Sequence, residues 1–288
     1  MKKQMNVFKT WVTLGRFFIL PLLILFTLFP NALAGFNIRN WLLAIFICGS
    51  VWVAAHYFNA SEDYRLGFDK IEGGSVAKEY TKASQIIPQG LFSVRGCDIT
   101  ALFLLLLSAF ILFFCAPLRL DIIILYLLGV FSCLSYVRVF KVHKIGEVCW
   151  VLAFFAVGAF SYSLCAHIDC TAIAVGILLG MLFLPFYILD QLPDMKPTDK
   201  VIDITEIIFA NKLNPSGFIF FGVTATYVIQ TGFVLMNWLP SMTLLSIFSL
   251  PVAHICGVYS DYKIEKGAML CFLWMTFYVL FATIGALL

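Results

Sequence analysis

The chain has 288 residues, of which 62% are hydrophobic and only 12% are charged, and its mean hydropathy is +0.97. This composition is too apolar for the surface of a water-soluble domain, which excludes a soluble enzyme. A formal net charge of +3 without a basic stripe also excludes a protein that binds nucleic acid. The sequence therefore predicts an integral membrane protein.

Nine apolar stretches follow one another along the chain, and each is long enough to cross a hydrocarbon core of ~30 Å as an α-helix. Their predicted limits are 14–33, 41–60, 98–117, 120–138, 147–167, 171–189, 216–238, 241–259 and 268–287. Together they predict an all-α integral membrane fold, a bundle of nine transmembrane helices that forms one domain over residues 1–288. The first stretch has a second interpretation, because Phe17 to Phe29 followed by Ala32-Leu33-Ala34 also resembles a signal peptide. Cleavage there would leave eight spans.

The charged residues are distributed unevenly between the two faces of this topology. Every Lys and Arg except Arg39 and Arg119 lies in the N-terminal segment or in the loops after the second, fourth, sixth and eighth spans. Because positively charged loops are retained in the cytoplasm, we expect a cytoplasmic N-terminus in a multi-pass protein of the bacterial inner membrane. Two long loops, 61–97 and 190–215, lie on the same face, which is where we expect the active site.

An acidic cluster stands at the end of the second span, in the sequence N-A-S-E-D-Y-R-L-G-F-D-K. Asn59 and Asp63 are four residues apart and therefore share one helical face. Gly67 permits the chain to turn, which would bring Asp69 back toward them. The spacing predicts a cation site at this helix end.

A second acidic cluster stands at the end of the sixth span, in the sequence I-L-D-Q-L-P-D-M-K-P-T-D-K. Asp190 and Asp194 share a helical face, and Pro193 and Pro197 end or kink the helix so that Asp199 can approach them.

Converging carboxylates in a partly dry site repel one another unless a cation lies between them. Mg²⁺ suits such sites, because it prefers carboxylate oxygens and binds through substrate phosphates. The predicted metal ligands are Asn59, Asp63, Asp69, Asp190, Asp194 and Asp199. The alternative is that both clusters are ordinary solvated loop ends.

These motifs resemble those of the UbiA-type intramembrane prenyltransferases, and most closely the dihydroxynaphthoate branch of menaquinone synthesis. In that branch the first motif reads N-D-Y-F-D-Y-x-x-G-x-D, which Asn59, Asp63, Gly67 and Asp69 match, whereas Ala60 replaces the first Asp. The second motif reads N-Q-x-P-D-x-x-x-D. Gln191, Pro193 and Asp194 match it, whereas Asp190 replaces the Asn and Asp199 comes one position late.

Weaker matches extend the resemblance over most of the chain. The segment from Arg16 to Pro21 looks like the family's R-P-x-T-L-P, and Ser84 to Ser93 looks like its G-S-R-V-L-x-x-G-L-L-S with Gln85 in place of the Arg. The segment from Tyr136 to Lys141 resembles the family's loop that runs from a tyrosine to a basic residue. The family's G-K-R-T-L is absent after the second motif.

The resemblance implies that an allylic prenyl diphosphate loses pyrophosphate and that a lipid-soluble, aromatic acceptor such as a quinone precursor traps the carbocation. Membrane lipid surrounds the site, and Mg²⁺ is the implied cofactor. On this interpretation Asp63, Asp194 and Lys141 are the catalytic residues. The candidate diphosphate-binding residues are Asn59, Arg16, Lys70, Tyr136 and Arg138. His56, three residues before Asn59, is a candidate contact for the acceptor or phosphate, or else a hydrogen-bonding helix residue.

Three other functions remain open at this level. A terpene cyclase on the same scaffold would close the carbocation on itself, without an acceptor. An inactive relative would account for Ala60, Gln85 and the missing G-K-R-T-L. A transporter with intramembrane carboxylates is disfavoured, because the acids lie at helix ends on one face rather than through the membrane.

Overall fold

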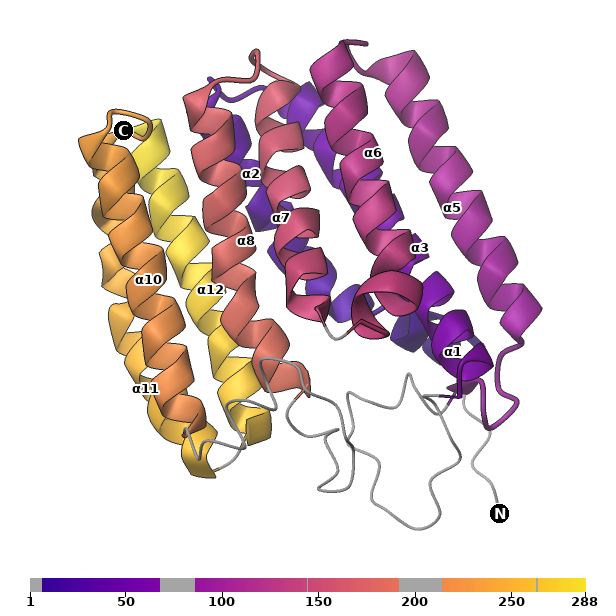
Figure 1. Cartoon of the computed structure of the whole chain (residues 1–288). Helices are drawn as coiled ribbons and strands as arrows, with labels where there is room; N and C mark the ends of the chain where they lie inside the picture. The colour runs from indigo at the N-terminus through magenta and orange to yellow at the C-terminus, as the bar shows by residue number, and fades with distance from the viewer. Residues whose placement is uncertain (1–6, 68–85, 144, 192–213, 263) are drawn as a thin grey trace.

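The computed structural model describes residues 7–67, 86–143, 145–191, 214–262 and 264–288. These residues form helices that stand side by side, with α5 and α6 at one edge of the bundle and α10 and α11 at the other (Figure 1). The helices in chain order are α1 (Val7–Leu14), η1 (Phe17–Ile19), α2 (Leu20–Leu33), α3 (Ile38–Arg65), α5 (Val94–Cys115), α6 (Leu120–Ser135), η2 (Tyr136–Lys141), α7 (Gly146–Ser163), α8 (Cys170–Gln191), α10 (Pro215–Leu235), η4 (Ser241–Ser249), α11 (Leu250–Tyr262) and α12 (Ile264–Leu287).

The prediction of an all-helical, multi-pass membrane protein is confirmed. Within the described residues, eight helices are long and apolar enough to cross a membrane. The outer faces of the bundle carry exposed apolar side chains, such as Phe103, Phe110 and Phe114 on α5. Such faces are typical of helices that contact lipid tails. An apolar side chain exposed to lipid does not incur the free-energy cost that it would incur in water.

The first of the nine predicted spans differs from the prediction of one helix over 14–33. Arg16 adopts a left-handed backbone conformation (φ 46°, ψ 44°) that separates α1 from η1 and α2. Because left-handed residues do not continue a right-handed helix, the apolar helix α2 has only 14 residues. It is shorter than the roughly 20 residues that a perpendicular span requires.

The predicted span 241–259 also differs, since it begins as a 3-10 helix, η4, and continues as α11. Thr243, Ser246 and Ser249 recur at the three-residue period of a 3-10 helix and are fully buried. Gln230 of α10 meets this stripe: its Nε2 donates to the Thr243 carbonyl (3.0 Å), and its Oε1 accepts from the hydroxyls of Ser246 and Tyr278 (both 2.8 Å). These bonds satisfy polar groups at membrane depth, where no water replaces them.

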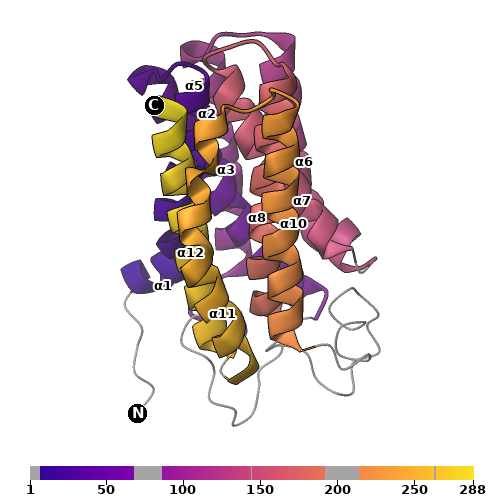
Figure 2. The same cartoon turned by 90° about the vertical axis from the view of Figure 1, so that its left-hand side faces the viewer.

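One end of the bundle carries the predicted site. There α3, η2 and α8 end while α5 and α7 begin, as Figures 1 and 2 show from two sides. We call it the Asp63 end. Within it, α7 packs between α6 and α8, and η2 lies against both α3 and α7.

Candidate active site

The inner face of α3 carries three predicted site residues in register. His56, Asn59 and Asp63 recur at intervals of three and four, so they form one stripe along the helix. His56 and Asn59 are 7% and 8% exposed, whereas Asp63 is half-buried near the helix end. The helix ends at Arg65; the Leu66 N–H donates to the Glu62 carbonyl (2.9 Å), and Gly67 follows with a left-handed φ of 76°. The predicted turn at Gly67 is therefore present.

Lys141 reaches this stripe from η2. Its Nζ lies 2.6 Å from Asp63 Oδ1, and both side chains are partly shielded, with 30% and 17% exposed. Residues 136–141 form a π-helix, in which the Val142 N–H donates to the Val137 carbonyl (3.3 Å) and the Ile145 N–H to the Phe140 carbonyl (2.9 Å). Single π turns of this kind are frequently found at functional sites.

The same π turn also reaches α8, the helix that carries the second acidic motif. The hydroxyls of Tyr136 and Tyr187 lie 3.1 Å apart, and both side chains are buried. Tyr187 precedes Asp190 by three residues, nearly one turn of α8. η2 thus contacts the end of α3 through Lys141 and the last turns of α8 through Tyr136.

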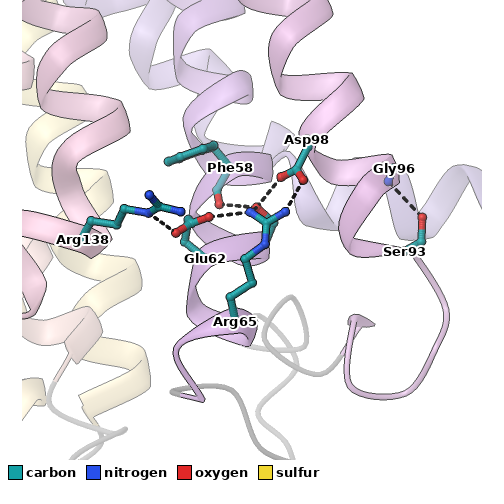
Figure 3. Close-up of polar contacts among 8 residues, drawn as sticks. Phe58, Glu62, Arg65, Ser93, Gly96, Asp98 and Arg138 are labelled. Atoms are coloured by element: carbon teal, nitrogen blue, oxygen red, sulfur yellow. Dashed lines mark hydrogen bonds and ion pairs between the residues drawn. The ribbon is translucent and has the colours of Figure 1, made fainter.

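A second charged group lies beside the Asp63–Lys141 pair, and sequence reasoning missed it. Figure 3 shows Glu62 between two arginines: its Oε1 accepts from Arg65 Nη1 (2.5 Å), and its Oε2 accepts from Arg138 Nε. Arg65 also pairs with Asp98 of α5, whose Oδ1 accepts from the Ser61 hydroxyl (2.8 Å). We call Glu62, Arg65, Asp98 and Arg138 the Glu62 cluster. Its two acids and two bases balance in charge.

Aromatic rings pack against one another deeper in the bundle, next to this charged end. Trp52 lies one turn before His56, with ring centroids 4.7 Å apart, and Trp150 of α7 lies 5.3 Å from Trp52. Phe183 of α8 stacks on Phe154 of α7 at 4.0 Å. Trp52 also lines an apolar pocket between α3, α6 and α7. The pocket and the charged end therefore adjoin the same aromatic cluster.

Three polar atoms of α3, two of them in the stripe, are buried without a hydrogen-bond partner among the described residues, namely Trp52 Nε1, His56 Nε2 and Asn59 Oδ1. A buried polar group without a partner is costly, so native proteins usually satisfy it with protein, water or ligand. Asn59 Oδ1 is an oxygen of the kind that Mg²⁺ prefers, and Asp63 supplies another one turn away. Within the described ranges, no group of three or more His, Cys, Asp or Glu side chains assembles a metal site.

The remaining predicted residues divide into two groups. Arg16 is partly exposed at the break before η1 and lies near enough to His56 to act on it electrostatically. The backbone of Asp190 lies in the last turn of α8. Four residues lie outside the described part of the chain, namely Asp69, Lys70, Asp194 and Asp199.

No protein-family model matches the sequence, and no curated protein matches it. Solved structures do match the fold. A digeranylgeranylglyceryl phosphate synthase is 16% identical and aligns over 98% of this chain and 99% of its own, with a TM-score of 0.67. A UbiA homologue from Archaeoglobus fulgidus bound to DMAPP and Mg²⁺ is 12% identical, with coverages of 96% and 99% and a TM-score of 0.57. The same homologue bound to GPP and Mg²⁺ is 11% identical, aligns over 95% of this chain and 99% of its own, and has a TM-score of 0.56.

At these identities the likeness establishes the fold, which is that of intramembrane prenyltransferases of the UbiA type. The alignment spans nearly the whole of each chain. The likeness therefore concerns the complete bundle rather than a few of its helices.

Proposed function

We propose that this protein is a UbiA-type prenyltransferase, which moves a prenyl group from an allylic prenyl diphosphate to a lipid-soluble acceptor with Mg²⁺ as cofactor. One observation carries the proposal. In a bundle of this fold, Asp63 of the first motif pairs with Lys141 at the end of the bundle where α8 reaches Asp190 and Gln191, the first residues of the second motif. The solved UbiA homologue of the same fold binds DMAPP or GPP together with Mg²⁺.

The residues fit the chemistry of diphosphate departure. Breaking the allylic C–O bond leaves both bonding electrons on the pyrophosphate, so positive charge placed beside it stabilises the transition state more than the ground state. Lys141 provides an ammonium that matches a phosphate oxygen as a point charge. Asn59 and Asp63, with Asp69, Asp190, Asp194 and Asp199, are the ligands we propose for Mg²⁺. When bound, the ion would neutralise charge on the phosphate oxygens.

The apolar part of the substrate requires a dry environment. We propose that the pocket between α3, α6 and α7 accommodates prenyl chain, because its lining is almost entirely apolar and includes Val51, Leu125 and Phe160. The aromatic cluster around Trp52 then lies between the chain and the diphosphate. Ring faces placed there stabilise a carbocation through their negative quadrupole.

We further propose that the acceptor is aromatic, a quinone precursor of the dihydroxynaphthoate type. We also propose that the Asp63 end faces the cytoplasm of a bacterial cell. The spacing from Asn59 through Gly67 to Asp69 supports the branch, and the left-handed Gly67 is consistent with that motif. The orientation is supported by the distribution of Lys and Arg.

The direct test uses purified protein with Mg²⁺ and prenyl diphosphates of graded length, with and without a membrane extract, and identifies the lipid product by mass. We expect pyrophosphate release that requires both Mg²⁺ and the acceptor. Chelation of the metal should abolish release. If no prenyl diphosphate is turned over with any extract, the proposal is wrong.

A terpene cyclase is the second candidate, and the aromatic cluster is the observation that favours it. Rings of Trp52, Trp150, Phe154 and Phe183 lie within 4.0–6.3 Å of one another, which suits stabilisation of a cation that closes on itself. Pyrophosphate release without any acceptor, together with a cyclic hydrocarbon product, would select this function.

A further inference from the structure

We infer that Glu62 is a positioning residue: through Arg138 it holds the π turn of η2 against α3, and this contact keeps Lys141 at Asp63. The inference rests on the proposed function, because it assigns a role to a neighbour of the proposed diphosphate site. It also revises the expectation for Arg138, which on this view acts through Glu62 rather than on the diphosphate.

Glu62 is buried at the end of α3. Its side chain is 1% exposed, although it lies only one residue from the half-buried Asp63. A buried carboxylate is tolerated only where charge and hydrogen bonds compensate the loss of water. Arg138 and Arg65 supply that compensation from two different elements, η2 and α3 (Figure 3).

The π turn of η2 carries two cations that pair with α3. Arg138 and Lys141 lie on the same π turn, and they pair with the consecutive residues Glu62 and Asp63. A π turn places one more residue in each hydrogen-bonded ring than an α-helix, so it rotates these two cations relative to their α-helical positions. Two adjacent ion pairs therefore fix one local conformation of η2.

Arg138 is largely exposed to solvent. Its side chain is 64% exposed, so solvent alone would leave it mobile, and Glu62 is the partner that orients it. Asp98 and Arg65 hold Glu62 from the opposite side and anchor the cluster to α5. Removal of the Glu62 charge would free Arg138 and loosen η2 against α3, while the Arg65–Asp98 pair stays in place.

The first test measures the affinity of the full-length protein in detergent for Mg²⁺ with inorganic pyrophosphate. We expect Glu62→Gln to weaken binding about tenfold, the usual scale for residues that orient a ligand-binding group. Lys141→Gln alone should weaken binding more than Glu62→Gln alone does. In the double variant, Glu62→Gln should add nothing to Lys141→Gln, because it acts through that lysine. Full additivity, or unchanged binding in Glu62→Gln, would overturn the inference.

The second test needs no ligand. Trypsin cleaves after Arg138 and Lys141, and release of the π turn should make cleavage after Lys141 several-fold faster in Glu62→Gln. Arg138→Gln breaks the same pair from its exposed side, so it should reproduce this effect even if Glu62→Gln does not fold. The matched control is Asp121→Asn, which breaks the Arg119–Asp121 pair (3.0 Å) at the opposite end of the bundle. It should change neither measurement.

The two proposals fail in different ways. A wild-type protein that does not bind Mg²⁺ with pyrophosphate contradicts the proposed function, whereas the protease result still decides whether Glu62 holds η2. Unchanged cleavage in both Glu62→Gln and Arg138→Gln contradicts the inference alone.

Discussion

Lys141 and Asp63 form an ion pair with 2.6 Å between Nζ and Oδ1, although 78 positions separate them in the sequence. The pair joins the π turn after α6 to the last turn of α3. It brings a cation and a carboxylate to one point at the end of the bundle, and these are the two kinds of charge that the proposed diphosphate and Mg²⁺ would need.

Replacement of Lys141 by Gln should lower kcat for pyrophosphate release about 100-fold, because one fixed positive charge is lost from the transition state. The same change leaves Asp63 without its cation. Lys141→Arg keeps the charge and should retain part of the activity. Release of labelled pyrophosphate gives the rate, and the thermal midpoint in detergent confirms folding. Equal rates in wild type and Lys141→Gln would remove this residue from the mechanism.

Replacement of Asp63 by Asn should abolish Mg²⁺-dependent turnover while the protein remains folded, since the amide keeps the shape but loses the charge that binds the metal. Asp194→Asn should have the same effect through the second motif. Turnover across a Mg²⁺ titration measures both. The assignment of the two motifs would not survive unchanged turnover in both variants.

His56→Phe should raise the KM for the acceptor about tenfold, the effect of losing one hydrogen bond of about 1.4 kcal/mol. It should leave the KM for the diphosphate unchanged. The reason is that His56 Nε2 has no partner among the described residues and lies beside the aromatic cluster rather than at the ion pair. Steady-state kinetics with each substrate varied in turn separates the two constants. A change confined to the diphosphate would assign His56 to the other substrate.

Gly285→Ala should destabilise the protein by about 1–3 kcal/mol, because overpacking forces the backbone apart. A Cβ at Gly285 on α12 would lie 1.9 Å from the Met242 carbonyl oxygen at the start of η4. Gly232→Ala on α10 is the matched control, since a Cβ there meets nothing within 4 Å. Thermal unfolding in one detergent should show a lower midpoint for Gly285→Ala only. Equal midpoints would mean that η4 and α12 are farther apart.

Gln230→Leu should cost about 1–3 kcal/mol, because the hydroxyls of Ser246 and Tyr278 lose their buried acceptor. Thr231→Val serves as the control, because among the described residues the Thr231 hydroxyl bonds only within its own helix, to the Tyr227 carbonyl (2.8 Å). Chemical unfolding in mixed micelles compares the two. A Gln230→Leu protein as stable as the control would show that this network contributes little.

The sequence was sufficient to predict the helical membrane class and the grouping of charged residues near helix ends. Both follow from long apolar runs and from charges that cannot enter lipid. The α3 stripe was also predictable, because Asn59 and Asp63 lie within one helical turn. The break at Arg16 was not, since arginine rarely adopts a left-handed conformation, and the adjacent Gly15, which could adopt it readily, does not.

The Glu62 cluster could not be predicted from sequence, because its partners are distant in the chain. Arg138 lies 76 positions from Glu62, and Asp98 lies 33 from Arg65. Only the Glu62–Arg65 spacing of three residues gave a local signal. The 3-10 helix η4 did leave a signal, namely the three-residue recurrence of Thr243, Ser246 and Ser249, although span length alone does not reveal it.

The π turn of η2 has a consequence for how this protein tolerates insertions and deletions. Loops far from the helices absorb a change in length, but residues 136–141 connect two helices while placing Tyr136, Arg138 and Lys141 against three separate partners. Loss of a single residue would restore ordinary α-helical winding and turn every later side chain of the segment by one position. Homologous chains that keep these pairings should therefore share the length of this segment even where their side chains differ.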